Sequence, residues 1–134
     1  SLARGDLLVL PDDGGATLQH VHADDVAQAF ALAILLRDVA IGEAFHVAAV
    51  EPVTLREYAE SAASWFGLEA NLDFMPWHEW RLSVNPRDAA LTQDHIMHSP
   101  YASVDKARTI LGFEPRYTAV AAAHEAVSFR NPGV

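Results

Sequence analysis

The residues best suited to bind a ring-bearing, anionic ligand stand in the segment 77–81, Trp-His-Glu-Trp-Arg. Tryptophan faces stack on planar or sugar rings, and a guanidinium binds phosphate through two parallel hydrogen bonds. Trp77 and Arg81, with Arg87 a few residues later, are therefore candidate substrate-binding residues. The alternative is that Trp77 and Trp80 fill gaps in the core, where large aromatic side chains are often buried.

Histidines form the second candidate group. His95 and His98 follow Asp94, and on a helix their spacing would place both imidazoles on one face. They could contact substrate, hold a metal ion or lie in a solvated loop, and we include both among the candidate substrate-binding residues. His20 and His22 lie two apart on a predicted strand, a spacing that a metal can use. No cysteine and no clear third ligand accompanies them, so we expect no metal site.

The stretch around which we expect the chain to be organised runs from Leu18 to Leu36. A short strand ends at Asp25, which we expect to cap a helix, with Gln28 completing a capping box. From Val26 to Leu36 the only polar side chain is Gln28. A helix that is apolar nearly all round must be buried on most sides, and this one is too short to cross a bilayer.

Apolar runs and turn residues predict the remaining elements. The first two strands would form a hairpin with each other, or pair with a sheet outside this chain. The predicted strands span 7–10, 16–23, 45–50 and 72–75, the helices 54–66, 77–83, 103–111 and 118–129, and the polar loop 85–100.

Composition limits the class of protein. With 134 residues, about half of them apolar, the chain should form a single domain covering residues 1–134. A net charge of −9 argues against partners such as nucleic acid or an anionic membrane. The chain has no cysteine, and no signal peptide or membrane-spanning run is apparent, which fits a cytoplasmic protein.

Four segments resemble, in the same order, motifs of the NAD-dependent epimerase/dehydratase family, the extended short-chain dehydrogenases. Each motif is built mostly of caps and core residues, but four in order across most of the chain make the resemblance specific. The matching segments are 22–27 (His-Ala-Asp-Asp-Val-Ala), 42–47 (Gly-Glu-Ala-Phe-His-Val), 53–57 (Val-Thr-Leu-Arg-Glu) and 101–115, which begins Tyr-Ala-Ser-Val-Asp-Lys.

The resemblance implies an α/β fold, or more narrowly an α+β-like fragment. It corresponds to the C-terminal, substrate-binding part of the family fold, with helices on a few short strands and the Rossmann core missing. In the family, a glycine-rich loop binds the nicotinamide cofactor and a Tyr-x-x-x-Lys pair supplies the base. Neither is found here, so we expect no catalytic and no cofactor-binding residue in this chain. The residues four positions after Tyr58, Tyr101 and Tyr117 are Ala62, Asp105 and Ala121.

Two family contacts to a nucleotide diphosphate are replaced in this sequence. The usual arginine four residues before the signature histidine is Leu18, and the ungapped counterparts of an R-x-x-D pair are Gln93 and Ile96. A gap in the alignment would move that pair onto Arg87 or Asp94. A buried diphosphate needs paired cations. The cations that could replace the lost contacts are Arg4, Arg81 and Arg87.

Three hypotheses follow for the function. The first is a substrate-binding fragment of an NAD(P)-dependent sugar or nucleotide-sugar epimerase/dehydratase-like oxidoreductase, inactive alone and lacking an N-terminal cofactor domain. Its partners would be that domain, a sugar-like substrate and, because strand edges lie open, a second copy in a homodimer. The alternative is a stand-alone interaction or dimerisation module without enzymatic activity. A third is a small metal- or ligand-binding domain that uses His95 and His98.

Overall fold

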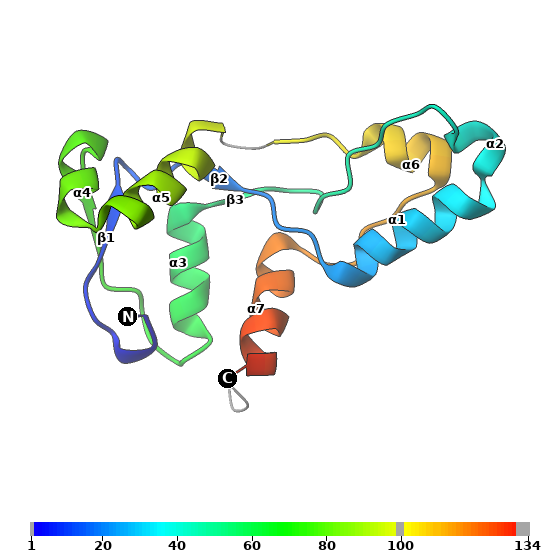
Figure 1. Ribbon diagram of the computed structural model, residues 1–134. Helices are drawn as coiled ribbons and strands as arrows, with labels where there is room; N and C mark the ends of the chain where they lie inside the picture. The colour runs from blue at the N-terminus through cyan, green and yellow to red at the C-terminus, as the bar shows by residue number, and fades with distance from the viewer. Residues whose placement is uncertain (1, 99–100, 131–134) are drawn as a thin grey trace.

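The computed structural model describes residues 2–98 and 101–130 of the chain. The helices in chain order are the 3-10 turn η1 (Leu2–Arg4), α1 (Ala23–Leu35), α2 (Arg37–Ala40), α3 (Leu55–Ser64), α4 (Trp77–Ser83), α5 (Pro86–His98), α6 (Asp105–Leu111) and α7 (Ala119–Arg130). The strands are β1 (Leu8–Pro11), β2 (Thr17–Leu18), β3 (Val53–Thr54) and β4 (Leu72–Met75). Figure 1 shows an elongated molecule with β1, α3, α4 and α5 toward one end and α1, α2 and α6 at the other.

The strands form two small ladders in which no hairpin joins β1 to β2. β1 pairs in parallel with β4, with Leu8 opposite Leu72, and β2 pairs antiparallel with β3. The predicted hairpin between the first two strands is therefore wrong. A turn through Asp12 and Gly14 follows β1, and it directs the chain toward β3 instead of back along β1.

Several predicted caps are confirmed. Thr54 and Glu57 form the expected capping box at the start of α3. Gly67, after α3, has a φ of +70°, and Gly112 ends α6 in the left-handed conformation. The hydroxyl of Thr118 accepts a hydrogen bond from the first turn of α7 at 3.1 Å.

The predicted loop 85–100 is wrong, because residues 86–98 form α5; residues 99 and 100 lie outside the described part. Pro86 occupies the first helical position, where proline costs no hydrogen bond. The side-chain oxygen of Asn85 accepts from the amide of Asp88 at 2.9 Å and so caps the helix. No residue of α5 is buried, which explains why its sequence lacks a clear apolar period.

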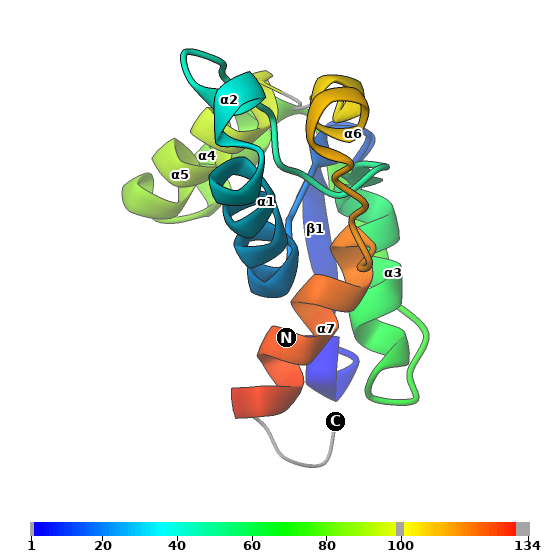
Figure 2. The same cartoon turned by 90° about the vertical axis from the view of Figure 1, so that its right-hand side faces the viewer.

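Helix α1 is far more exposed than its sequence predicts. Within it only Asp25 and Ala29 are buried, whereas Phe30, Ile34 and Leu35 are 69%, 74% and 78% exposed. The helix packs on α2 and α6, and Figure 2 views this end of the molecule, with α1 and α2 in front. The expectation that the helix is buried on most sides is therefore wrong for this chain.

Residues 45–50, predicted to be a strand, are not in one. Ala48 and Ala49 are buried and anchor the segment, while Phe45 and Val47 pack against the nearby core. Within the described part of the chain, the backbone groups of residues 44–48 form no hydrogen bond. The segment therefore has the composition of a strand without a strand beside it.

Two small clusters of buried residues stand out in the interior. One lies between α1 and α6 and contains Ala29, Ala48, Val104, Ala107 and Phe113. The other contains Ala49, Val53 and Ala119, with Leu18, Tyr58 and Val120 against it.

One side chain connects the segments that run between these clusters. The amide nitrogen of Gln19 donates to the carbonyls of Ala49 (2.8 Å) and Ala102 (3.0 Å), and its oxygen accepts from the Ala102 amide at 2.7 Å.

Among the described residues, no helix is long and apolar enough to span a membrane.

Candidate functional site

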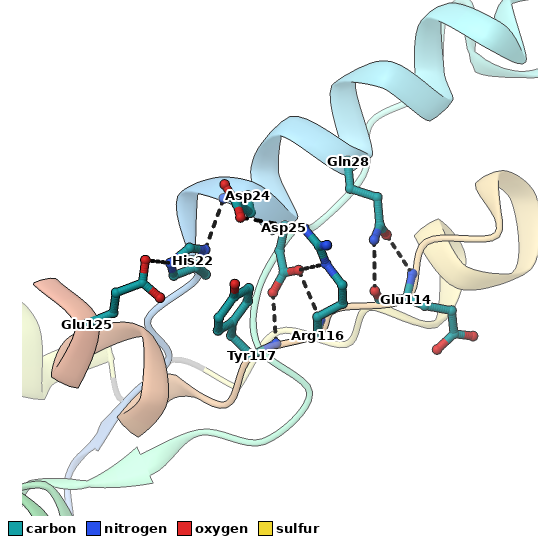
Figure 3. A network of polar contacts seen from close by, with 8 residues as sticks. All are labelled: His22, Asp24, Asp25, Gln28, Glu114, Arg116, Tyr117 and Glu125. Carbon is teal, nitrogen blue, oxygen red and sulfur yellow. Dashed lines mark hydrogen bonds and ion pairs between the residues drawn. The ribbon is translucent and has the colours of Figure 1, made fainter.

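The polar network at the start of α1 is centred on Asp25, whose side chain is fully buried (Figure 3). Its carboxylate accepts from the backbone amides of Arg116 (3.0 Å) and Tyr117 (3.2 Å). The Arg116 guanidinium lies 3.7 Å from the same carboxylate. A buried carboxylate is stable only when it is paired and hydrogen-bonded in this way. Asp25 thus fixes the segment before α7 against α1 and is not available for catalysis.

His22, and not Asp25, is the N-cap of α1. Its Nδ1 accepts from the backbone amide of Asp24 at 3.1 Å, so the ring proton of the neutral form sits on Nε2. Nε2 lies 3.3 Å from the carboxylate of Glu125 on α7, and the ring stacks on Tyr117 at 3.8 Å. Nδ1 of His22 therefore caps α1, while Nε2 links the start of this helix to α7.

The expected capping role of Gln28 is also wrong. Its side-chain amide pairs with the backbone of Glu114, donating to the carbonyl at 3.1 Å and accepting from the amide at 2.9 Å. Figure 3 shows Gln28 and Asp25 reaching the same segment from successive turns of α1. Sequence reasoning missed Arg116 and Tyr117, although an acidic side chain in a nearly apolar helix signals that a distant partner exists.

The imidazoles of His20 and His22 have separate neighbours, since His20 lies against Tyr58 with ring centroids 5.8 Å apart. Among the residues that the structure describes, no three histidine or acidic side chains are placed to hold a metal ion.

The candidate substrate-binding residues lie on two adjoining helices. Trp77 and Arg81 belong to α4, where Trp77 is half-buried and stacks on Trp80 at 5.6 Å. Trp80 is buried, and its indole N–H donates to the carbonyl of Val9 in β1 at 2.8 Å. Trp80 therefore fills the core, while Trp77 and Arg81 border the surface.

Arg87, His95 and His98 lie on α5, and all three are exposed. Nδ1 of His95 donates to the carbonyl of Leu91, and Nδ1 of His98 to that of Asp94, each at 2.8 Å. Because α4 and α5 are in contact, the fold gathers all five candidates in one region.

A hollow of about 430 Å³ lies beside these helices, between the turn after β1 and Ile96 of α5. Asp12 and Asp13 line it, and Asp12 has a φ of +52°. The Asp12 carboxylate also accepts from the backbone amide of Trp77 at 2.9 Å, which ties the hollow to the start of α4. Carboxylates of this kind accept hydrogen bonds from sugar hydroxyls and repel phosphate.

Comparison with known proteins finds similarity to solved structures but none to family models or curated sequences. No protein-family model matches the chain, and no curated protein matches it in sequence. The chain is similar to the crystal structure of UDP-glucuronic acid 4-epimerase from Bacillus cereus in complex with NAD, with a TM-score of 0.63 and 17% identity, covering 99% of this chain and 37% of the epimerase. The same epimerase in complex with UDP-glucuronic acid and NAD gives a TM-score of 0.64 at 16% identity, covering 96% and 37%.

The chain therefore spans 37% of the length of these epimerases. Its fold is that of part of an extended short-chain dehydrogenase epimerase, which confirms the α/β fragment predicted from the sequence.

Proposed function

We propose that this chain is the substrate-binding part of an NAD(P)-dependent nucleotide-sugar epimerase/dehydratase-like oxidoreductase. The observation that carries the proposal is the coverage: 99% of this chain aligns with 37% of an epimerase that binds NAD. Because the chain has neither a glycine-rich loop nor a Tyr-x-x-x-Lys pair, hydride transfer would require a cofactor domain from outside it. This chain would contribute the walls of the substrate site.

The surface left open around α1 supports this proposal. Phe30, Ile34 and Leu35, together with the backbone of residues 44–48, form what we call the open face. A small apolar hollow lined by Phe30, Phe45 and their neighbours makes the two parts continuous. Unpaired backbone groups beside an apolar helix are the features by which a chain adds to a sheet edge.

We assign the open face to the cofactor domain of the same enzyme. Full burial of each large apolar side chain would contribute about 1.5–3 kcal/mol, and the backbone of residues 44–48 would gain strand partners. In the isolated chain, we expect the same face to pair with a second copy.

The substrate would lie in the hollow beside α4 and α5, so the cofactor domain that covers the open face must also extend to this hollow for hydride transfer. Asp12 and Asp13 would accept hydrogen bonds from sugar hydroxyls. Arg81 and Arg87 would bind phosphate, His95 and His98 would donate or accept at the rim, and Trp77 would stack on a ring. The sugar-like substrate class rests on this combination of carboxylates, cations and aromatic rings.

The test begins with the reading frame that encodes this chain, which we expect to contain a glycine-rich strand-turn-helix and a Tyr-x-x-x-Lys pair. Co-production of this chain with the cofactor domain should give NAD-dependent epimerisation of UDP-glucuronic acid. NMR of the sugar measures this reaction. Phe30→Asp should abolish assembly. Phe129→Asp, a change at an even more exposed phenylalanine on α7, should leave assembly intact.

Two outcomes would contradict the proposal: a reading frame without a cofactor domain, or unchanged assembly of Phe30→Asp. A stable dimer of the chain with no affinity for nucleotide sugars would support the alternative of a stand-alone interaction module.

A further inference from the structure

A second cavity, of about 570 Å³, lies between α3, α7 and the segment that joins β2 to α1. Figures 1 and 2 both show α3 and α7 side by side, and the two helices are in contact. The α7 side of the cavity is lined by Ala122, Ala123 and Ala126, and Arg130 stands at the end of that helix. None of the candidate substrate-binding residues lines this cavity.

The charge around this cavity differs from that of the chain as a whole. The protein has 18 acidic against 9 basic residues, so an anion is repelled from most of its surface. Of the residues that the structure describes, no acidic one lines the cavity, whereas Arg130 and His20 do. The cavity thus offers a guanidinium and an imidazole donor, both on exposed residues, to an anionic group.

The side of the cavity opposite α7 is aromatic. The rings of His20 and Tyr58 lie 5.8 Å apart at its edge. Tyr58 in turn contacts Trp65 edge-on at 6.2 Å, so its ring is held in place from behind. Aromatic side chains facing a wall of alanine methyls, with Val21 and Val127 completing the apolar lining, suit a flat ring.

We propose that this cavity binds a small molecule that combines a planar aromatic ring with one anionic group, either a carboxylate or a phosphate ester. The ring lies between Tyr58 and the alanines of α7, and the anion contacts Arg130 and His20. The proposal stands apart from the epimerase-like function, because it uses other residues and needs no cofactor domain.

The test uses the isolated chain with ¹³C-labelled alanine methyl groups, observed by NMR at pH 6.5. Benzoate and phenyl phosphate are the probes for the two kinds of anion. Benzamide keeps the ring without charge, and acetate keeps the charge without a ring. Both aromatic anions, or one of them, should shift the methyls of Ala122, Ala123 and Ala126 saturably, while Ala48 and Ala49 stay unmoved. Whichever anion binds more tightly identifies the anionic group.

Two variants locate the anion. Arg130→Gln, at an exposed helix end that should not affect folding, should weaken binding of the better probe about tenfold, the usual effect of losing a charge-assisted hydrogen bond. Arg37→Gln removes an exposed arginine far from the cavity and should leave affinity unchanged. The proposal is overturned if neither probe shifts the α7 methyls by 20 mM. Binding of benzamide as tight as that of benzoate would also overturn it, as would equal effects of the two arginine variants.

Discussion

Replacing Asp25 with asparagine tests whether the buried network at the start of α1 supports the fold. The substitution keeps the shape of the side chain but removes its charge and one of its two acceptor oxygens. In the native structure both oxygens accept backbone amides, at 3.0 and 3.2 Å, and the Arg116 guanidinium lies 3.7 Å away. In Asp25→Asn, one buried amide would face an NH₂ group and the guanidinium would lose its partner.

The expected cost follows from these contacts. A hydrogen bond to a charged group contributes about 1.5–3 kcal/mol, and a buried amide left unpaired costs about 1–3 kcal/mol. Because one of the two bonds survives in neutral form, we expect Asp25→Asn to lower the free energy of unfolding by about 2–4 kcal/mol. That is a large part of the stability of a small domain, which is about 5–15 kcal/mol.

Asp24→Asn provides the matched control. Asp24 is the neighbouring residue, its side chain is largely exposed, and it lies 3.7 Å from the same Arg116 guanidinium. Its loss should cost less than about 1 kcal/mol, because exposed ion pairs and first-turn charges contribute little. Urea unfolding followed by circular dichroism measures both variants. Equal losses for Asp24→Asn and Asp25→Asn, or a loss below about 1 kcal/mol for Asp25→Asn, would refute the reasoning.

Three further predictions concern local features. Hydrogen bonds from the amide and hydroxyl of Thr54 lower the pKa of Glu57, so its stabilising effect is present at neutral pH and disappears as the pH falls through that lowered pKa; an NMR titration midpoint at or above the ordinary glutamate range would contradict this. Gly14→Ala should lower the free energy of unfolding by about 2 kcal/mol or more, because φ is positive and the new methyl group would lie 3.2–3.3 Å from neighbouring side chains. Gly67→Ala has a similar φ but open space around it, and should cost about 1–2 kcal/mol. Equal urea midpoints for the two variants would show that crowding at Gly14 is unimportant. Trp80→Phe leaves a carbonyl of β1 without its donor and should cost about 1–3 kcal/mol, and an unchanged thermal midpoint would show that the indole hydrogen bond is dispensable.

Local signals in the sequence predicted local structure well. The Thr54–Glu57 pair defines the start of α3, and Gly112 marks the end of α6, because caps and left-handed glycines act within one turn of chain. The strand at 72–75 was bounded by Pro76 and is observed with the same limits. The α/β fragment, predicted from motif order, is confirmed by the fold comparison.

What the sequence could not predict depended on distant partners. Asp25 has the residue type and the position of a helix cap. Its burial depends instead on hydrogen bonds from the backbone amides of Arg116 and Tyr117, which are 91 and 92 residues away in sequence. The 45–50 segment has the residues of a strand, but strand formation requires a neighbouring strand. Of the candidate site, the sequence predicted that His95 and His98 share a helix face if helical, but not that α4 and α5 adjoin a hollow lined by Asp12 and Asp13.

The side chain of Gln19 has a consequence for how the molecule tolerates change. The two buried clusters are separate. The side-chain amide of Gln19 forms hydrogen bonds to both Ala49 and Ala102 at the point where the segments between the clusters cross. A glutamate there would match the shape but would present oxygens to two carbonyl oxygens, so the crossing depends on an uncharged amide that both donates and accepts hydrogen bonds. Position 19 therefore tolerates little change, since all three of these hydrogen bonds come from one side chain.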